Sequence, residues 1–243
     1  MNVLMNSLWI LLIAHFISDF MLQSKQCAEK KTKYLRYLWL HAFIYGCVVG
    51  VAAFVWMPVH IAWIPVVVIA ASHLAIDALR IWLDKQYETP VFGFGSFVID
   101  QVLHVGIICA MVWKFDLGIH TRAWISTWPG PVSLEEILRY LLLFVVILQP
   151  ASVFVQKVTL CATGEKYTQG KREPAVGNII GKLERIIIAI LVLCGEIGAI
   201  GFVLTAKSLA RYKQLNEQGF AERYLVGTLS STAVAIIAAL VLK

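Results

Sequence analysis

Charged residues are scarce in this 243-residue chain, in which Asp, Glu, Lys and Arg make up 15% of the sequence. A soluble domain carries about a quarter charged residues. Here 59% of the residues are hydrophobic and the mean hydropathy is +0.76. Long apolar stretches offer few groups to water, so the composition excludes a soluble globular protein and predicts an integral membrane protein.

Cysteine pairs and a cleavable leader are also missing. The five cysteines occur singly, without a Cys-x-x-Cys pair, which argues against a disulfide framework and a zinc ribbon. The N-terminus lacks a basic region and a small-residue cleavage site, and its apolar run contains His15 and Asp19. We therefore expect a retained first helix rather than a signal peptide. The net charge of +6 comes from short basic clusters beside apolar segments, so no nucleic-acid partner is expected.

Seven apolar segments approach the length of about 20 residues that a helix needs to cross a bilayer. We therefore predict an all-α, polytopic transmembrane helix bundle of about seven spans that forms a single domain over residues 1–243. Its two parts would be a His/Asp-bearing four-helix part at 1–113 and C-terminal helices at 114–243. The predicted spans are 7–23, 38–57, 61–83, 97–113, 135–156, 179–206 and 224–242.

Basic residues gather in alternate loops, which sets the expected orientation. The loop at 25–36, the loop at 80–85, and the loop containing Lys157, Lys166, Lys171 and Arg172 should be cytoplasmic. The N-terminus would then lie outside the plasma membrane and the C-terminus inside. Lys207, Arg211 and Lys213 disagree, because seven spans place them outside. Either the last two segments do not both cross, or this stretch is an amphipathic interfacial segment.

Imidazole and carboxylate groups occur in each of the first four predicted spans, mostly as i, i+4 pairs that share a helical face. An unpaired aspartate at a helix centre costs about 2.5–3.5 kcal/mol, so we expect these groups to meet. All lie in the cytoplasmic halves of their spans, which predicts one shared site. They are His15, Asp19 and Gln23; His41 and Tyr45; His73 and Asp77; and Asp100, Gln101 and His104.

A short internal similarity points to the same site. IAHFISDF at residues 13–20 resembles ASHLAIDA at 71–78, so the first four spans can form a repeat of two hairpins that face each other. Chance similarity stays open as an alternative for so short a match.

Histidine with aspartate suits Zn, Mn or Fe(II), and we predict one or two divalent ions. The alternative is a set of interhelical hydrogen bonds that holds the bundle together. The expected ligands are His15, Asp19, His73, Asp77, Asp100 and His104. The expected catalytic residues are Asp77, Asp100 and His41. The expected substrate-binding residues are Gln23 and Tyr45, with Lys182 and Arg185 near the start of the sixth span available for a lipid phosphate.

Four motifs in order, AHFISDFMLQ, LHAFIYG, SHLAIDALR and IDQVLHV, resemble the bacterial integral membrane proteins grouped as domain of unknown function 3307. The likeness covers about residues 8–110. It implies a location in the bacterial inner membrane and carries no known activity. The His-x-x-x-Asp motif alone is also similar to that of inner-membrane metal-dependent hydrolases.

Three functions fit these patterns. The first is an intramembrane metal-dependent hydrolase that acts on a lipid or another membrane-embedded ester or phosphoester. The second is a metal-ion or proton transporter or channel, which needs access from both faces. The third is a non-catalytic scaffold, whose carboxylates would be paired with Lys or Arg. Membrane lipid is the expected partner, and the glycines of the sixth span (Gly195, Gly198 and Gly201) would support an oligomer.

Overall fold

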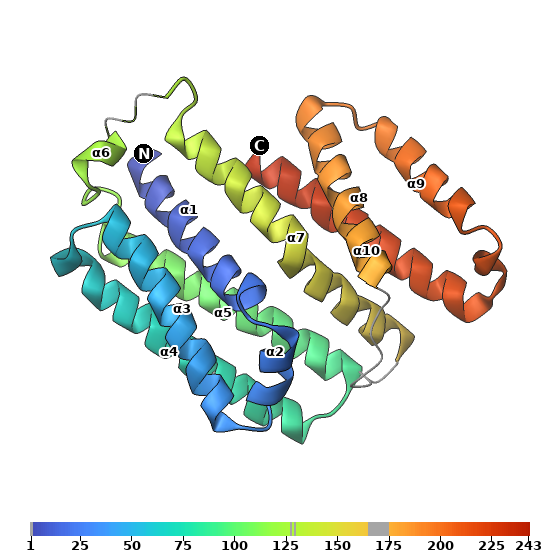
Figure 1. Cartoon of the computed structure of the whole chain (residues 1–243), viewed down its shortest axis with the longest axis horizontal. Coiled ribbons are helices and arrows are strands. Elements are labelled where there is room, and N and C mark those ends of the chain that lie inside the picture. The colour runs from blue at the N-terminus through green and yellow to red at the C-terminus, as the bar shows by residue number, and fades with distance from the viewer. Residues whose placement is uncertain (1, 127, 129, 165–174) are drawn as a thin grey trace. The chain divides into compact units, whose positions relative to one another are not determined.

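The computed structural model describes residues 2–126, 128, 130–164 and 175–243, and no strand occurs among them. The prediction of an all-α fold is confirmed. The elements, labelled in Figure 1 where there is room, are α1 (Asn2–Phe16), η1 (Ile17–Met21), α2 (Lys25–Lys31), α3 (Leu35–Trp56), α4 (Val59–Gln86), α5 (Pro90–Lys114), α6 (Ala123–Ser126), α7 (Leu134–Thr163), α8 (Ala175–Cys194), α9 (Ala199–Ala210), η2 (Gln214–Asn216) and α10 (Gln218–Leu242).

The chain forms two compact units. The first consists of Met1–Glu88 and Gly95–Leu142, and the second of Thr89–Phe94 and Leu143–Lys243. The His/Asp-bearing part expected at 1–113 lies in the first unit apart from Thr89–Phe94. Of the basic loop expected after the fifth span, Lys166, Lys171 and Arg172 lie outside the described residues.

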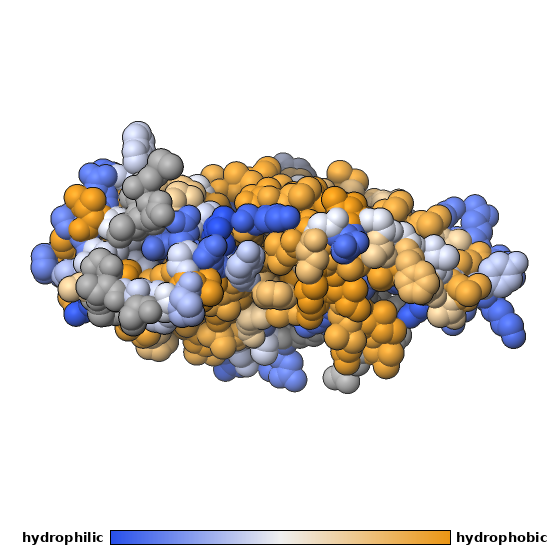
Figure 2. Space-filling view, turned by 90° about the horizontal axis from the view of Figure 1, so that it is seen from above, coloured by the Kyte–Doolittle hydropathy of each residue, from blue (hydrophilic) through white to orange (hydrophobic). Residues whose placement is uncertain are grey.

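Five helices are long and apolar enough to cross a membrane: α3, α4, α5, α7 and α10. Large apolar side chains such as Phe43, Val51 and Val67 are 57–70% exposed, as expected for positions that face lipid. Apolar residues also cover much of the face seen in Figure 2. The chain is a multi-pass membrane protein.

The prediction of seven spans is wrong at the first and sixth segments. The first apolar helix, Met5–Met21, falls among the shorter apolar helices and ends in the π-helical turn η1. The sixth segment breaks at Gly195, whose φ of +85° favours glycine. Instead of one long helix it forms α8 and α9. The expectation of a cytoplasmic C-terminus rested on seven crossings and loses that support.

Figure 1 shows α9 running back beside α8. The Lys207 ammonium of α9 donates to the buried Glu184 carboxylate of α8, which closes this helical hairpin. Because α8 also contains Lys182 and Arg185, its central turns are too polar for a simple lipid-exposed span. The hairpin is a feature of the second unit that the apolar run length could not reveal.

A buried arginine holds the second unit together. Pro150 interrupts α7 and has no N–H to donate to the preceding turn. Arg185, 3% exposed, donates to the carbonyl oxygens of Ile147 and Leu148 beside this point. It also donates to the hydroxyls of Ser152 on α7 and Ser231 on α10. One guanidinium therefore joins α7, α8 and α10.

Replacing Arg185 with methionine should destabilise the second unit by about 2–4 kcal/mol, because two carbonyls and two hydroxyls lose a charged donor in an apolar setting. The measurement is the free energy of unfolding in mixed micelles. Lys213→Met, which removes the same charge from an exposed position of this unit, is the control. Equal stability of the two variants would contradict the assigned role of Arg185.

Candidate metal centre

The first histidine and aspartate of the site lie on either side of the junction between α1 and η1. The Leu22 amide donates to the Ile17 carbonyl at 2.9 Å, an i to i+5 bond that widens this turn. Ser18 and Asp19 are buried within it, and the Ser18 hydroxyl donates to the Ala14 carbonyl at 2.7 Å. A π-helical turn in a membrane helix is often found at a functional site, and it turns Asp19 toward α3 and α4.

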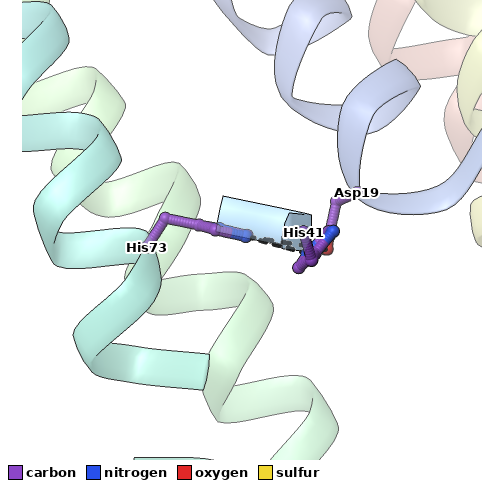
Figure 3. Close-up of side chains that lie close together, drawn as sticks. All are labelled: Asp19, His41 and His73. Carbon is purple, nitrogen blue, oxygen red and sulfur yellow. Dashed lines mark hydrogen bonds and ion pairs between the residues drawn. The ribbon is translucent and has the colours of Figure 1, made fainter. Parts of the chain in front are cut away.

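Asp19, His41 and His73 form the first group of candidate ligands. His41 Nε2 lies 3.2 Å from Asp19 Oδ1 and 3.1 Å from His73 Nε2. It also lies 3.5 Å from Asp77 Oδ2. Figure 3 shows the His73 side chain reaching from α4 toward His41 and Asp19. All four side chains are buried, with at most 8% of each residue exposed.

A single hydrogen cannot pair His41 Nε2 with all of its neighbours at once, although Asp77 Oδ2 also accepts from Lys31. A neutral imidazole nitrogen either donates one proton or accepts one. If His41 Nε2 carries a proton, it donates to only one of its neighbours, and the others face it without a hydrogen bond. If it carries none, its lone pair points at the carboxylate oxygens of Asp19 and Asp77. A cation between the four atoms removes this conflict, because each of them presents a lone pair to it.

The spacing of these atoms also suits a small divalent ion. Zinc binds nitrogen and oxygen at about 2.0–2.2 Å, so neighbouring ligand atoms of a tetrahedral site lie about 3.3–3.6 Å apart. The three contacts of His41 Nε2 are 3.1–3.5 Å long. His73 Nε2 lies 3.9 Å from Asp77 Oδ2 and 4.0 Å from Asp19 Oδ1. Small side-chain adjustments would bring all four atoms onto one ion.

Asp77, Asp100 and His104 form a second group, in which one ligand atom from each residue lies within 4.8 Å of the others. Asp100 Oδ1 and His104 Nε2 are buried without a hydrogen-bond partner and lie 3.5 Å apart. Two unpartnered atoms of this kind in a membrane interior are costly unless a cation joins them. Asp77 belongs to this second group, and its Oδ2 also lies 3.5 Å from His41 Nε2 of the first group, so it can bridge two ions.

Neighbouring side chains hold the two groups in place. The Tyr45 ring stacks on His73 with centroids 3.6 Å apart and an angle of 2°, and its hydroxyl lies 3.1 Å from His15 Nδ1. His15 Nε2 lies 3.4 Å from Gln101 Oε1. The Gln101 amide donates to Asp19 Oδ2 at 3.0 Å and to Asp100 Oδ2 at 2.9 Å, and so links the two groups.

These contacts change how three of the predicted residues are understood. His15, predicted as a ligand, lies close to the centre, with its ring centroid 6.3 Å from that of His73, but both of its nitrogens already face Tyr45 or Gln101. Tyr45, predicted to bind substrate, is 1% exposed and supports His73 from behind. His41, predicted to be catalytic, sits among the ligands of the first group.

Two cations border the centre. Lys31 Nζ lies 2.7 Å from Asp77 Oδ2, and Arg80 Nη1 lies 3.1 Å from Asp100 Oδ2. Pairing of this kind is what the scaffold alternative predicts. It leaves three carboxylates facing two cations, and it leaves Asp100 Oδ1 with only His104 Nε2, 3.5 Å away, as its ion-pair partner.

Lys31 and Arg80 were not among the predicted site residues, and Gln101 was predicted to lie at the site without an assigned role. Arg80 follows His73 by seven positions on the same face of α4, and Gln101 adjoins Asp100, so both had a signal in the sequence. Lys31 had none, because it reaches Asp77 only through the fold of α2 over the bundle.

The remaining predicted substrate residues belong to neither ligand group. Gln23 is half-buried in the bend after η1, and its Nε2 is buried without a hydrogen-bond partner. Lys182 and Arg185 belong to the second unit. The guanidinium of Arg185 already donates to carbonyls and hydroxyls of the protein, so its donors are taken.

A family model described as "Protein of unknown function (DUF3307)" matches residues 7–129, just over half of the chain. The chain belongs to this family. The family resemblance of the four motifs is thereby confirmed, and both ligand groups of the DUF3307 protein lie inside the matched region. No curated protein and no solved structure matches the chain.

Proposed function

We propose that this DUF3307 protein is an intramembrane metal-dependent hydrolase that cleaves an ester or phosphoester of a lipid or another membrane-embedded substrate. The observation that carries the proposal is the set of buried imidazole and carboxylate atoms around His41 Nε2, which lie at metal-ligand spacing and cannot all be hydrogen-bonded to it at once. Zn, Mn or Fe(II) suits these donors, and the position of Asp77 beside both groups allows one or two ions.

The proposed roles follow from the geometry. Asp19, His41 and His73, with Asp77 Oδ2 beside them, would hold one ion, and Asp77, Asp100 and His104 would hold a second. A divalent ion held by the three residues of the second group would keep a coordination position for water and would make that water acidic enough to attack near neutral pH. The water oxygen bonds to the carbonyl carbon or phosphorus of the substrate. The ester bond to the leaving oxygen breaks, and that oxygen takes up a proton from the water.

The one-sided surroundings of the centre favour a hydrolase over a transporter. On one side lie the partly exposed Lys31 and Arg80. On the other side, one or two turns along each helix, the core is filled by Leu11, Val49, Ile69 and Ile108, each at most 2% exposed. From position 42 to position 76 the chain has no Asp, Glu, Lys or Arg. An ion would find no polar path through this apolar layer.

The same asymmetry gives the proposed orientation. By the positive-inside rule, the end that carries Lys31 and Arg80 faces the cytoplasm of a bacterial cell. The centre then opens toward the cytoplasmic face of the inner membrane, and the start of α1 lies toward the opposite face.

Purified protein reconstituted with a membrane lipid extract and Zn, Mn or Fe(II) should release new lipid products detectable by mass spectrometry. A chelator should stop their formation, and Asp84→Asn should not, because Asp84 lies on α4 outside both groups. If no product forms with any of the three ions and ions enter protein-containing vesicles, the protein is a transporter and the hydrolase proposal is wrong.

A further inference from the structure

A cavity of about 200 Å³ lies beside the candidate metal centre, between the α2–α3 connection and α4. Lysines line it from three positions, Lys31, Lys33 and Lys85, and its walls include Tyr34, Leu38 and Trp82. The residues that line it include no carboxylate. The cavity is therefore complementary to an anion, whereas the neighbouring centre is complementary to a cation.

Lys31 connects the cavity to the centre. Its side chain is 12% exposed and lines the cavity, while its ammonium lies 2.7 Å from Asp77 Oδ2. Ala78, the next residue along α4, also lines the cavity. Only the Lys31 side chain would separate a group bound in the cavity from Asp77. A substrate of the centre has to approach this ligand.

The walls indicate a ligand that is partly in lipid. Leu35, Tyr34 and Trp82, which line the cavity, are 53–73% exposed, and tyrosine and tryptophan are enriched at the level of lipid headgroups. Lys85 is exposed and has no side-chain partner among the described residues. Since a water fills about 30 Å³, the cavity holds about six waters, enough for a phosphate and part of a glycerol but not for acyl chains.

We propose that this cavity binds the phosphate of an anionic glycerophospholipid, whose acyl chains stay in the bilayer beside Leu35 and Trp82. As a statement about substrate, the inference rests on the proposed hydrolase function. It moves headgroup recognition from Arg185, whose donors are taken, to Lys85 and Lys33, with Lys31 paired to Asp77 between the cavity and the centre. Lysine binds phosphate as a compact charge, and basic pockets between cytoplasmic helix ends bind anionic headgroups.

The test compares binding of phosphatidylglycerol and phosphatidylcholine by native mass spectrometry of the full chain, stripped of divalent ions so that no turnover occurs. The wild type should prefer phosphatidylglycerol. Lys85→Gln should weaken this preference about fivefold. The matched control is Lys30→Gln, the same charge change in α2 at a side chain that lies over Tyr37 and does not line the cavity. Trp82→Phe should reduce the quenching of tryptophan fluorescence by brominated phosphatidylglycerol, while exposed tryptophans elsewhere, such as Trp113, keep the remainder.

Three outcomes would overturn the inference: no preference in the wild type, equal effects of Lys85→Gln and Lys30→Gln, or displacement of the lipid by millimolar inorganic phosphate. The last would make the cavity a site for free phosphate. Preferential binding without hydrolysis in the presence of metal would leave this inference standing and refute the hydrolase. Hydrolysis of a neutral ester without preferential binding of phosphatidylglycerol would support the hydrolase and refute this inference.

Discussion

Replacing Asp77 with asparagine should remove bound divalent metal from the protein almost completely. Asp77 belongs to the second group and lies 3.5 Å from His41 Nε2 of the first, and asparagine keeps its shape while removing the charge and one anionic oxygen. Each group would be left with a single carboxylate, from Asp19 or Asp100, in a setting that excludes water. Elemental analysis after dialysis against Zn or Mn measures the loss.

Asp84→Asn is the matched control for this variant. Asp84 lies on the same helix, accepts a hydrogen bond from Ser96 at 2.6 Å and belongs to neither group, so its replacement should leave metal content unchanged. Both variants should migrate as the wild type does in size-exclusion chromatography. A folded Asp77→Asn protein with wild-type metal content would show that the histidines and aspartates serve helix packing and not metal binding.

Replacing Asp100 with asparagine should slow the proposed hydrolysis by about 10³-fold while leaving one ion bound. The first group keeps Asp19, His41 and His73, with Asp77 beside them, whereas the second loses the carboxylate whose Oδ1 has no hydrogen-bond partner. Loss of one metal contribution of about 4 kcal/mol to the transition state corresponds to about that factor. The readouts are turnover of the lipid product and metal content of the same preparation.

Two results would count against this division of roles. Wild-type turnover in Asp100→Asn would show that the second group takes no part in catalysis. Loss of all metal from a folded Asp100→Asn protein would show one site instead of two. An equivalent loss of turnover in Asp84→Asn would point to a general effect of charge on α4.

The helical fold could be predicted because apolar run length reflects what lipid demands of a backbone. The four helices with His/Asp motifs occur near their expected positions, since a charge inside a membrane is tolerated only where a partner exists. The i, i+4 spacing of His73 and Asp77 also correctly predicted that both lie on one face of α4. Composition could not show where the backbone departs from a regular helix, so the π-helical turn at Asp19 and the break at Gly195 were missed.

The surroundings of the candidate centre were less predictable. Lys31 was interpreted as a loop cation that sets orientation, yet it reaches Asp77 across 46 positions of sequence. Arg185 was interpreted as a headgroup ligand, yet it caps carbonyls near Pro150 on another helix. Both contacts depend on which helices pack together, and a single run of apolar residues does not encode that choice.

The metal content of the purified wild-type protein tests the central claim most directly. The full chain, stripped with a chelator and then dialysed against Zn, Mn or Fe(II), should retain one or two equivalents of at least one ion, measured by elemental analysis. Retention of less than about a tenth of an equivalent of each ion by folded protein would contradict the account, and the buried histidines and aspartates would then hold the helices together without metal.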